Sequence, residues 1–234
     1  MKSLSSVVLC ALAILGAAQL ARAGDAPPAP TGPYHVTAYV EVVPTATNQA
    51  VGFMKAYRDA ARREPGATTI EVYQELGMPS RFVTREVWAD AQAYDAHSKA
   101  ASMNDLVAKA KPVEYGPVDV RTHTVHFETP NARGAAAGSV VIISHLDVTP
   151  NGIPMLLDLM KGLGEGTSKE QGVATYQILR QTGGARNHFR LFEIWTNEND
   201  WQKHNLASHT QVARDGMQSL LGTPYDQRKY AIVN

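Results

Sequence analysis

The sequence predicts an α+β fold made of two tandem domains, each an antiparallel sheet with helices on one face, which pair within the chain as an α/β barrel. Three observations predict it. A five-residue pattern occurs twice, each copy follows the same order of strands and helices, and the third strand of each copy is apolar on both faces. The pattern Phe82, Glu86, Trp88, Tyr94 and His97 recurs 107 positions later as Phe189, Glu193, Trp195, Trp201 and His204.

A repeat of this length indicates a duplicated domain, because solenoid repeats are roughly 20 to 50 residues long. Flanking residues such as Glu64 and Glu170 match at a shift of 106, so one residue is inserted in the loop before the pattern. We expect domain 1 at residues 34–128 (copy one), a linker at 129–138 and domain 2 at 139–234 (copy two).

The first 23 residues predict a signal peptide. The apolar run from Val7 to Ala21 is shorter than the ~20 residues that span a bilayer as a helix, and Ala21-Arg22-Ala23 fits a signal peptidase site. We expect a periplasmic or secreted protein with no membrane span after cleavage, and a flexible tether at 24–33 because that segment is rich in proline and glycine. Cys10 lies inside the signal peptide, so the mature chain has no thiol for a disulfide, a metal or catalysis.

The charge of the mature chain excludes partners that bind by bulk charge. The full chain has 22 basic and 22 acidic residues, and removal of Lys2 and Arg22 leaves a small excess of acid. We therefore expect no nucleic-acid partner and no attraction to an anionic membrane.

The first half of each copy is a strand followed by a helix. The strand spans 36–43, or 140–148 in copy two, and Pro44 or Pro150 ends it because proline has no N–H to donate to a sheet. The 3-3-4 spacing of apolar residues that starts at Val51 then predicts an amphipathic helix, and copy two repeats this helix from Met155.

The second half of each copy completes the sheet. Two strands joined by a turn are expected at 68–75 and 81–88, helical segments at 90–100 and 102–111, and a last strand at 118–127. The order βαββαβ, with helices on one face of an antiparallel sheet, is an α+β sandwich.

The third strand predicts how the copies pair. Alternation places Phe189, Leu191, Glu193 and Trp195 on one face, and the opposite face is also largely apolar. A strand that is apolar on both faces is covered on both. Helices cover one face, so the sheet of the other copy covers the second and forms a barrel. We expect Glu86 and Glu193 to point into that barrel interior.

On these residues the chain resembles the antibiotic biosynthesis monooxygenase family. Copy two has Glu193-Ile-Trp195 and then a helix with Trp201 and His204, with a second histidine at His209. Copy one keeps the pattern but has Ser102 where the second histidine would fall. The resemblance implies a ferredoxin-like fold in each copy, paired as a dimeric α+β barrel. Members of the family include quinol and polyketide monooxygenases, haem degraders and proteins of no known activity.

Two interpretations of Glu86 and Glu193 remain open. A carboxylate between Phe and Trp on an interior strand should have a raised pKa from desolvation, unless a cation pairs with it. Such a group can serve as a general base that deprotonates a phenolic substrate. Alternatively, each is a structural carboxylate that accepts hydrogen bonds from a nearby indole, histidine or backbone group.

His209 differs between the copies. Ser208 followed by Gln211 fits a capping box, which places His209 in the first turn of a new helix. Its five-residue spacing from His204, with a helix break between them, predicts that the two histidines lie apart. We therefore predict no metal site and no cofactor. Neither copy presents the Trp and His pair of the haem-degrading members.

These observations favour an exported, cofactor-independent monooxygenase that acts with molecular oxygen on a quinol or other electron-rich aromatic. The predicted catalytic residues are Glu193, His204 and His209. The predicted substrate-binding residues are Trp195, Trp201, Phe189, Glu86, Trp88 and His97. The alternatives are a non-catalytic periplasmic binding protein for a hydrophobic small molecule and a haem-related role, and a homo-oligomer is possible. The observation that discriminates between the enzyme and the binding protein is whether the cavity between the sheets is open and holds unpaired polar groups. A filled, dry core would favour a structural role.

Overall fold

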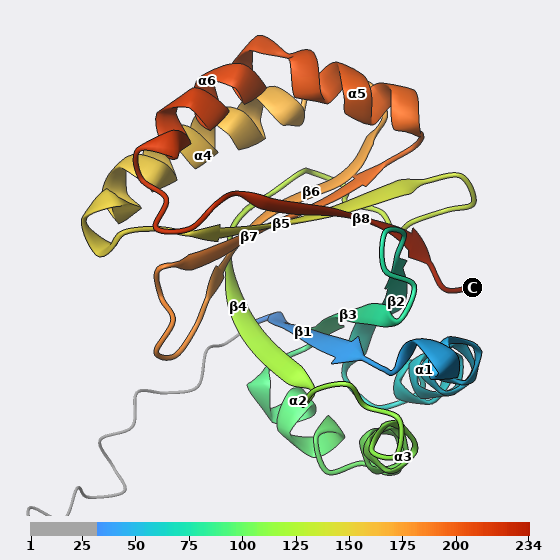
Figure 1. Ribbon diagram of the computed structural model, residues 1–234. Helices are drawn as coiled ribbons and strands as arrows, with labels where there is room; N and C mark the ends of the chain where they lie inside the picture. The colour runs from blue at the N-terminus through green and yellow to red at the C-terminus, as the bar shows by residue number, and fades with distance from the viewer. Residues whose placement is uncertain (1–31) are drawn as a thin grey trace, which may run out of the picture.

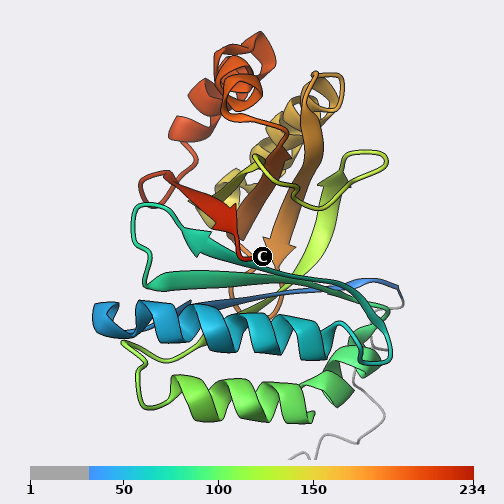
Figure 2. The same cartoon turned by 90° about the vertical axis from the view of Figure 1, so that its right-hand side faces the viewer.

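A computed structural model describes residues 32–234. In it, two sheets face each other and the helices of the two copies cover opposite outer sides (Figure 1). Figure 2 shows the same layers from the side, with the helices of copy one below the sheets and those of copy two above. The predicted signal peptide and residues 24–31 of the predicted tether lie outside the described residues.

Copy one follows the predicted order. Its elements are β1 (Tyr34–Glu41), a 3-10 turn (Pro44–Ala46), α1 (Thr47–Ala61), β2 (Ala67–Glu75), β3 (Arg81–Trp88), α2 (Ala91–His97), α3 (Ala101–Ala110) and β4 (Asp119–Glu128). Gly66 makes the turn between α1 and β2 with φ +82°, a conformation that side chains other than glycine rarely adopt.

Copy two repeats this order. Its elements are β5 (Val140–Asp147), a 3-10 turn (Pro150–Gly152), α4 (Ile153–Thr167), β6 (Val173–Gln181), β7 (His188–Trp195), α5 (Glu198–Leu206), α6 (Ser208–Gln218) and β8 (Asp226–Ile232). The hairpin loop before β7 spans 182–187, against 76–80 before β3, so the inserted residue lies in this loop.

The eight strands form one closed antiparallel barrel in the order β1-β3-β2-β8-β5-β7-β6-β4. The last strand of each copy joins the two halves, since β8 pairs with β2 and β4 pairs with β6. This arrangement confirms the predicted α+β fold and the barrel within one chain. Among the described residues, no helix is long and apolar enough to cross a membrane.

The alternation predicted for the third strands is confirmed, but the face assigned to the glutamates is wrong. Phe189, Leu191 and Trp195 belong to the apolar layer between sheet and helices, whereas Phe192 and Ile194 lie in the barrel interior. Glu86 and Glu193 therefore face the helices. The physical reason is the position of their hydrogen-bond donors. Each glutamate accepts a hydrogen bond from the tryptophan indole two residues later on its own strand, and Glu86 also accepts one from the Tyr57 hydroxyl on α1.

Candidate active site

The helix side of copy one contains a closed hydrogen-bond network around Glu86, which is 1% exposed. Its carboxylate accepts hydrogen bonds from Tyr57 Oη at 2.6 Å, Thr84 Oγ1 at 2.9 Å and Trp88 Nε1 at 3.1 Å. Three donors satisfy a buried carboxylate, so this glutamate fits the structural interpretation.

His97 completes the same network. Its ring stacks on Trp88 with centroids 4.3 Å apart. Its Nδ1 lies 2.8 Å from Glu64 Oε2 and its Nε2 lies 3.0 Å from Tyr57 Oη. Ser102 at the start of α3 also donates to Glu64. The predicted substrate-binding residues Glu86, Trp88 and His97 thus bind one another in a buried layer.

Copy two places different partners around Glu193. Leu163 stands where copy one has Tyr57, and Tyr176, the cross-strand neighbour of Glu193, stands where copy one has Ile70. Among the described residues, the donor to Glu193 is Trp195 Nε1 at 2.8 Å. Burial raises the pKa of Glu193 above its ordinary value. This carboxylate has fewer donors than its counterpart in copy one.

Six buried side-chain atoms within residues 32–234 lack a hydrogen-bond partner, and they fall into two groups. Tyr176 Oη, Trp201 Nε1 and His209 Nε2 lie in the helix-side layer of copy two; the other three lie at one end of the barrel. None belongs to the matching layer of copy one. Burial raises the pKa of Tyr176 well above its ordinary value, so its hydroxyl keeps its proton. Copy two therefore has an unsatisfied polar centre where copy one has a satisfied one.

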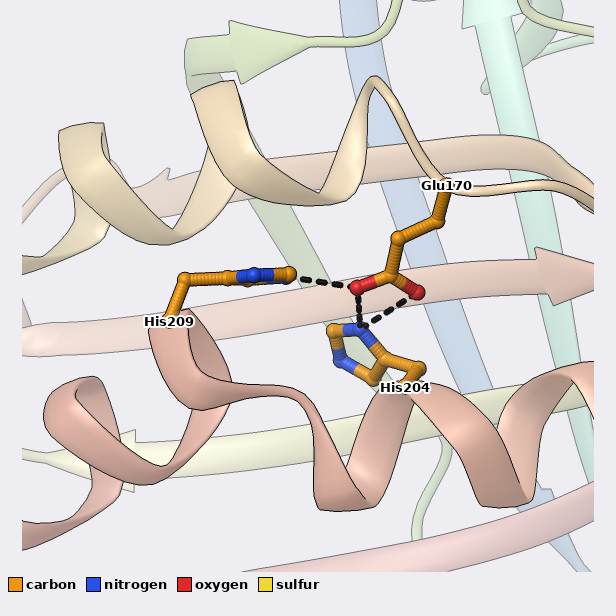
Figure 3. Close-up of side chains that lie close together, drawn as sticks. All are labelled: Glu170, His204 and His209. Carbon is orange, nitrogen blue, oxygen red and sulfur yellow. Dashed lines mark hydrogen bonds and ion pairs between the residues drawn. The ribbon is translucent and has the colours of Figure 1, made fainter.

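We define the Glu170 cluster as Glu170, His204 and His209, which meet between α4, α5 and α6 (Figure 3). His204 Nδ1 lies 3.0 and 3.2 Å from the two Glu170 oxygens. His209 Nε2 lies 2.5 Å from Glu170 Oε1, an ion-pair distance, but the approach is not aligned with a hydrogen bond. The rings of the two histidines are 5.9 Å apart.

Two details of the prediction for His209 are wrong. The helix break after α5 turns α6 so that His204 and His209 share one carboxylate, whereas the prediction placed them apart. The expected capping box is not formed, because Ala207 is the N-cap of α6 and no side chain caps this end. The helix does begin at Ser208, with His209 in its first turn as expected.

A glycine on α4 makes room for His209. A Cβ added to Gly166 would lie 2.5 Å from His209 Cγ, which no real contact allows. Copy one has Ala60 at the matching position of α1 and the small Ser102 in place of the histidine. The two differences are complementary, so the second imidazole fits only in copy two.

The Glu170 cluster has two chemical capabilities. Its three ligand atoms lie within 4.8 Å of one another, and two imidazoles with a carboxylate are a donor set that zinc and similar divalent ions accept. The cluster also joins the interior to solvent, because His204 is buried while the side chains of His209 and Glu170 are 25% and 17% exposed. Imidazole and carboxylate groups in such a row can pass protons.

The barrel interior is not a filled, dry core. A cavity of about 530 Å³, which we call the barrel-mouth cavity, opens at one end of the barrel and takes residues from all eight strands. The second group of unpartnered atoms lies there: His123 Nδ1, His145 Nδ1 and Arg190 Nε. Phe189 is the predicted site residue that borders it, although its side chain belongs to the apolar layer on the helix side of β7. The sequence analysis did not predict His123, His145 or Arg190 as site residues. The charged Arg190 on a strand that is otherwise largely apolar on both faces could have indicated this site.

Comparison with known proteins adds the family. The family model "Antibiotic biosynthesis monooxygenase" matches residues 33–109 and 139–216. The Bacillus subtilis (strain 168) protein "Putative monooxygenase YcnE" is 28% identical over 83 residues, which cover 36% of this chain and 87% of that protein.

Solved structures share the two-copy fold. The crystal structure of "Putative monooxygenase (FN1347)" from Fusobacterium nucleatum has a TM-score of 0.78 at 14% identity, and the match covers 87% of this chain and 94% of that one. An "anthrone oxidase-like protein" has a TM-score of 0.67 at 12% identity, covering 88% and 92%.

Proposed function

Because this chain belongs to the antibiotic biosynthesis monooxygenase family, we propose that it is a cofactor-independent monooxygenase for a quinol or another electron-rich aromatic, with its active centre on the helix side of copy two. The observation that carries the proposal is the contrast between the copies. Equivalent positions form a satisfied network around Glu86 and an unsatisfied one around Glu193.

Glu193 is the proposed general base. A base works best when its pKa lies near the working pH, and burial moves the pKa of this carboxyl upward in that direction. A phenolic substrate would give its proton to Glu193 and become a phenolate, which passes an electron to molecular oxygen. In the complete reaction, two substrate hydrogens leave with one oxygen atom as water while the other oxygen atom joins a ring carbon. The substrate supplies all four electrons.

The residues around Glu193 are proposed to carry its proton to solvent and to keep its surroundings apolar. His204 lies against Trp195, with ring centroids 4.8 Å apart, and connects through Glu170 to His209 and solvent. The proposed route for the proton runs along these three groups. Trp195 and Trp201 pack in the apolar layer beside Glu193, and exclusion of water from this layer would strengthen the electrostatic interactions of the phenolate and of superoxide.

Oxygen uptake with a panel of quinols tests the proposal. The wild-type protein is expected to consume oxygen with at least one quinol. Glu193→Gln is expected to lower turnover roughly 10²- to 10⁴-fold, the range of a lost general base. Glu86→Gln, the matched variant in copy one, is expected to retain turnover per folded molecule. Full uptake by Glu193→Gln would remove the base assignment, and no uptake by the wild type with any quinol would remove the activity.

We also infer export to the periplasm or secretion, supported by the sequence of residues 1–23 and by the absence of cysteine after them. N-terminal sequencing of the protein from fractionated cells is expected to give Gly24 as the first residue. A cytoplasmic protein that begins at Met1 would contradict this.

A further inference from the structure

The barrel-mouth cavity contains a buried positive charge without a negative partner. Arg190 is 3% exposed, and its guanidinium donates to Thr37 Oγ1 of the other copy. Its Nε has no partner, and no carboxylate of the described residues forms an ion pair with it. Burial of an unpaired charge is costly, so this arginine needs a reason other than stability.

Arg85 provides an internal comparison. It also projects into the barrel and approaches the same ring, with its guanidinium 4.9 Å from the centroid of Phe192 against 5.9 Å for Arg190. Arg85, however, pairs with Glu71 at 2.8 Å. The barrel thus has one compensated arginine and one uncompensated arginine, and the uncompensated one lines the cavity.

The acidic side chains at the rim of the cavity are already paired. Arg228 binds Asp226 at 2.9 Å and approaches Glu75 at 3.5 Å, and Arg121 binds Asp119 at 2.6 Å. The two other acids that line the cavity also have partners, since Glu41 pairs with Arg81 at 3.1 Å and Asp147 accepts a hydrogen bond from Asn187 at 2.8 Å. Each of these five acids thus has a partner other than Arg190.

Two imidazoles next to Arg190 are neutral. Burial, with Arg190 and Arg121, lowers the pKa of His123 to about 2 and that of His145 to about 4. Tyr39 Oη lies 2.7 Å from His145 Nε2, so the free Nδ1 of His145 faces a different direction, 3.6 Å from Asp226. Neutral imidazoles add hydrogen-bonding capacity without further charge.

We propose that the barrel-mouth cavity is a second ligand site that binds a small aromatic carboxylate, with its carboxylate on Arg190 and its ring against Tyr39 and Tyr230. A planar guanidinium matches a carboxylate in geometry. The guanidinium of Arg190, which has no acidic partner, carries a single positive charge and fits a monoanion better than a dianionic phosphate. A cavity of about 530 Å³ is within the range for small organic ligands. The site does not depend on the proposed oxygenase centre, because Arg190 and Glu193 project from opposite faces of β7.

Calorimetric titration of the full mature chain with sodium benzoate, and with benzamide as the neutral analogue, tests the proposal. Benzoate is expected to bind in a saturable way and benzamide about tenfold or more weakly, because one hydrogen-bonded charge pair contributes at least that factor. Arg190→Met is expected to lose benzoate binding by a similar factor. Removal of an unpaired charge should also leave the melting temperature without benzoate unchanged or higher.

Two further variants keep the test decisive. Arg190→Lys retains the charge and loses the planar fork, so it is expected to weaken benzoate binding even if Arg190→Met does not fold. Glu193→Gln is expected to bind benzoate as the wild type does. The proposal is overturned if benzoate does not bind, if Arg190 variants bind it equally, if Glu193→Gln abolishes binding, or if inorganic phosphate competes with equal affinity.

Discussion

Glutamine substitution in each copy should separate a structural glutamate from a functional one. Glu86 Oε1 accepts two hydrogen bonds, from Tyr57 at 2.6 Å and Thr84 at 2.9 Å, and Oε2 accepts one from Trp88 at 3.1 Å. Glutamine has one acceptor oxygen, so in either orientation its NH₂ group faces at least one donor. The substitution Glu86→Gln therefore leaves a buried donor unmatched.

The magnitude follows from the number of donors. A lost hydrogen bond to a buried charged group costs about 1.5–3 kcal/mol of the free energy of unfolding. One kcal/mol lowers the melting temperature by roughly 2–4 °C in a chain of this size, so Glu86→Gln should lower it by roughly 3–12 °C. Glu193 has Trp195 as its described donor, and a glutamine oxygen can keep that bond. Glu193→Gln should therefore cost less than about 1 kcal/mol.

Thermal unfolding followed by circular dichroism measures both variants at one protein concentration and pH. Tyr57→Phe is the control for copy one, since it removes a single donor to Glu86 and should fall between the wild type and Glu86→Gln. A loss of stability in Glu193→Gln equal to that in Glu86→Gln would refute the reasoning. It would mean that both carboxylates act as structural acceptors.

Three further outcomes follow from the same geometry. Gly166→Ala should displace the His209 ring, because its Cβ would lie 2.5 Å from Cγ, and should reduce oxygen uptake as much as His209→Ala; unchanged uptake would contradict the relay. The pKa values of His35 and His145 are lowered to about 4 in the folded protein, so the unfolded chain binds protons first and stability should fall as the pH drops from about 6.5 to 4. Urea unfolding at several pH values measures this, and a flat profile would be inconsistent with it. Chelators should not alter turnover, whereas Zn²⁺ should inhibit it by binding the Glu170 cluster, and His209→Ser should relieve that inhibition; equal inhibition of both proteins would place the zinc elsewhere.

Local patterns in the sequence were sufficient to predict the secondary structure and the duplication. The period of two along β7 and the 3-3-4 spacing in α1 depend on residues a few positions apart. The direction of Glu193 depends on which sheet face the helices cover. Because both faces of the strand are apolar, no local signal separates them, and the prediction assigned the glutamates to the wrong face.

The candidate site could not be predicted from local patterns, because it depends on contacts between segments that are distant in the sequence. Glu170 lies in the turn before β6, and its match to Glu64 was visible, but the contact with His204 and His209 requires the packing of α4, α5 and α6. The exchange of Tyr57 on a helix for Tyr176 on a strand is invisible in an aligned repeat, since the two tyrosines occupy different repeat positions.

Copy one shows that this fold can satisfy its central carboxylate, so the unsatisfied state in copy two is not forced by the architecture. Each buried polar group without a partner costs about 1–3 kcal/mol, and the helix-side layer of copy two has two, Tyr176 Oη and Trp201 Nε1, besides His209 Nε2, which meets Glu170 only as an ion pair. Their combined cost is large beside the 5–15 kcal/mol by which a typical domain is stable. A tyrosine at position 163, as at Tyr57, would supply a donor at the matching site. A structural role alone gives no reason for Leu163 there, whereas a base that must accept a substrate proton requires an acceptor that protein donors have not already occupied.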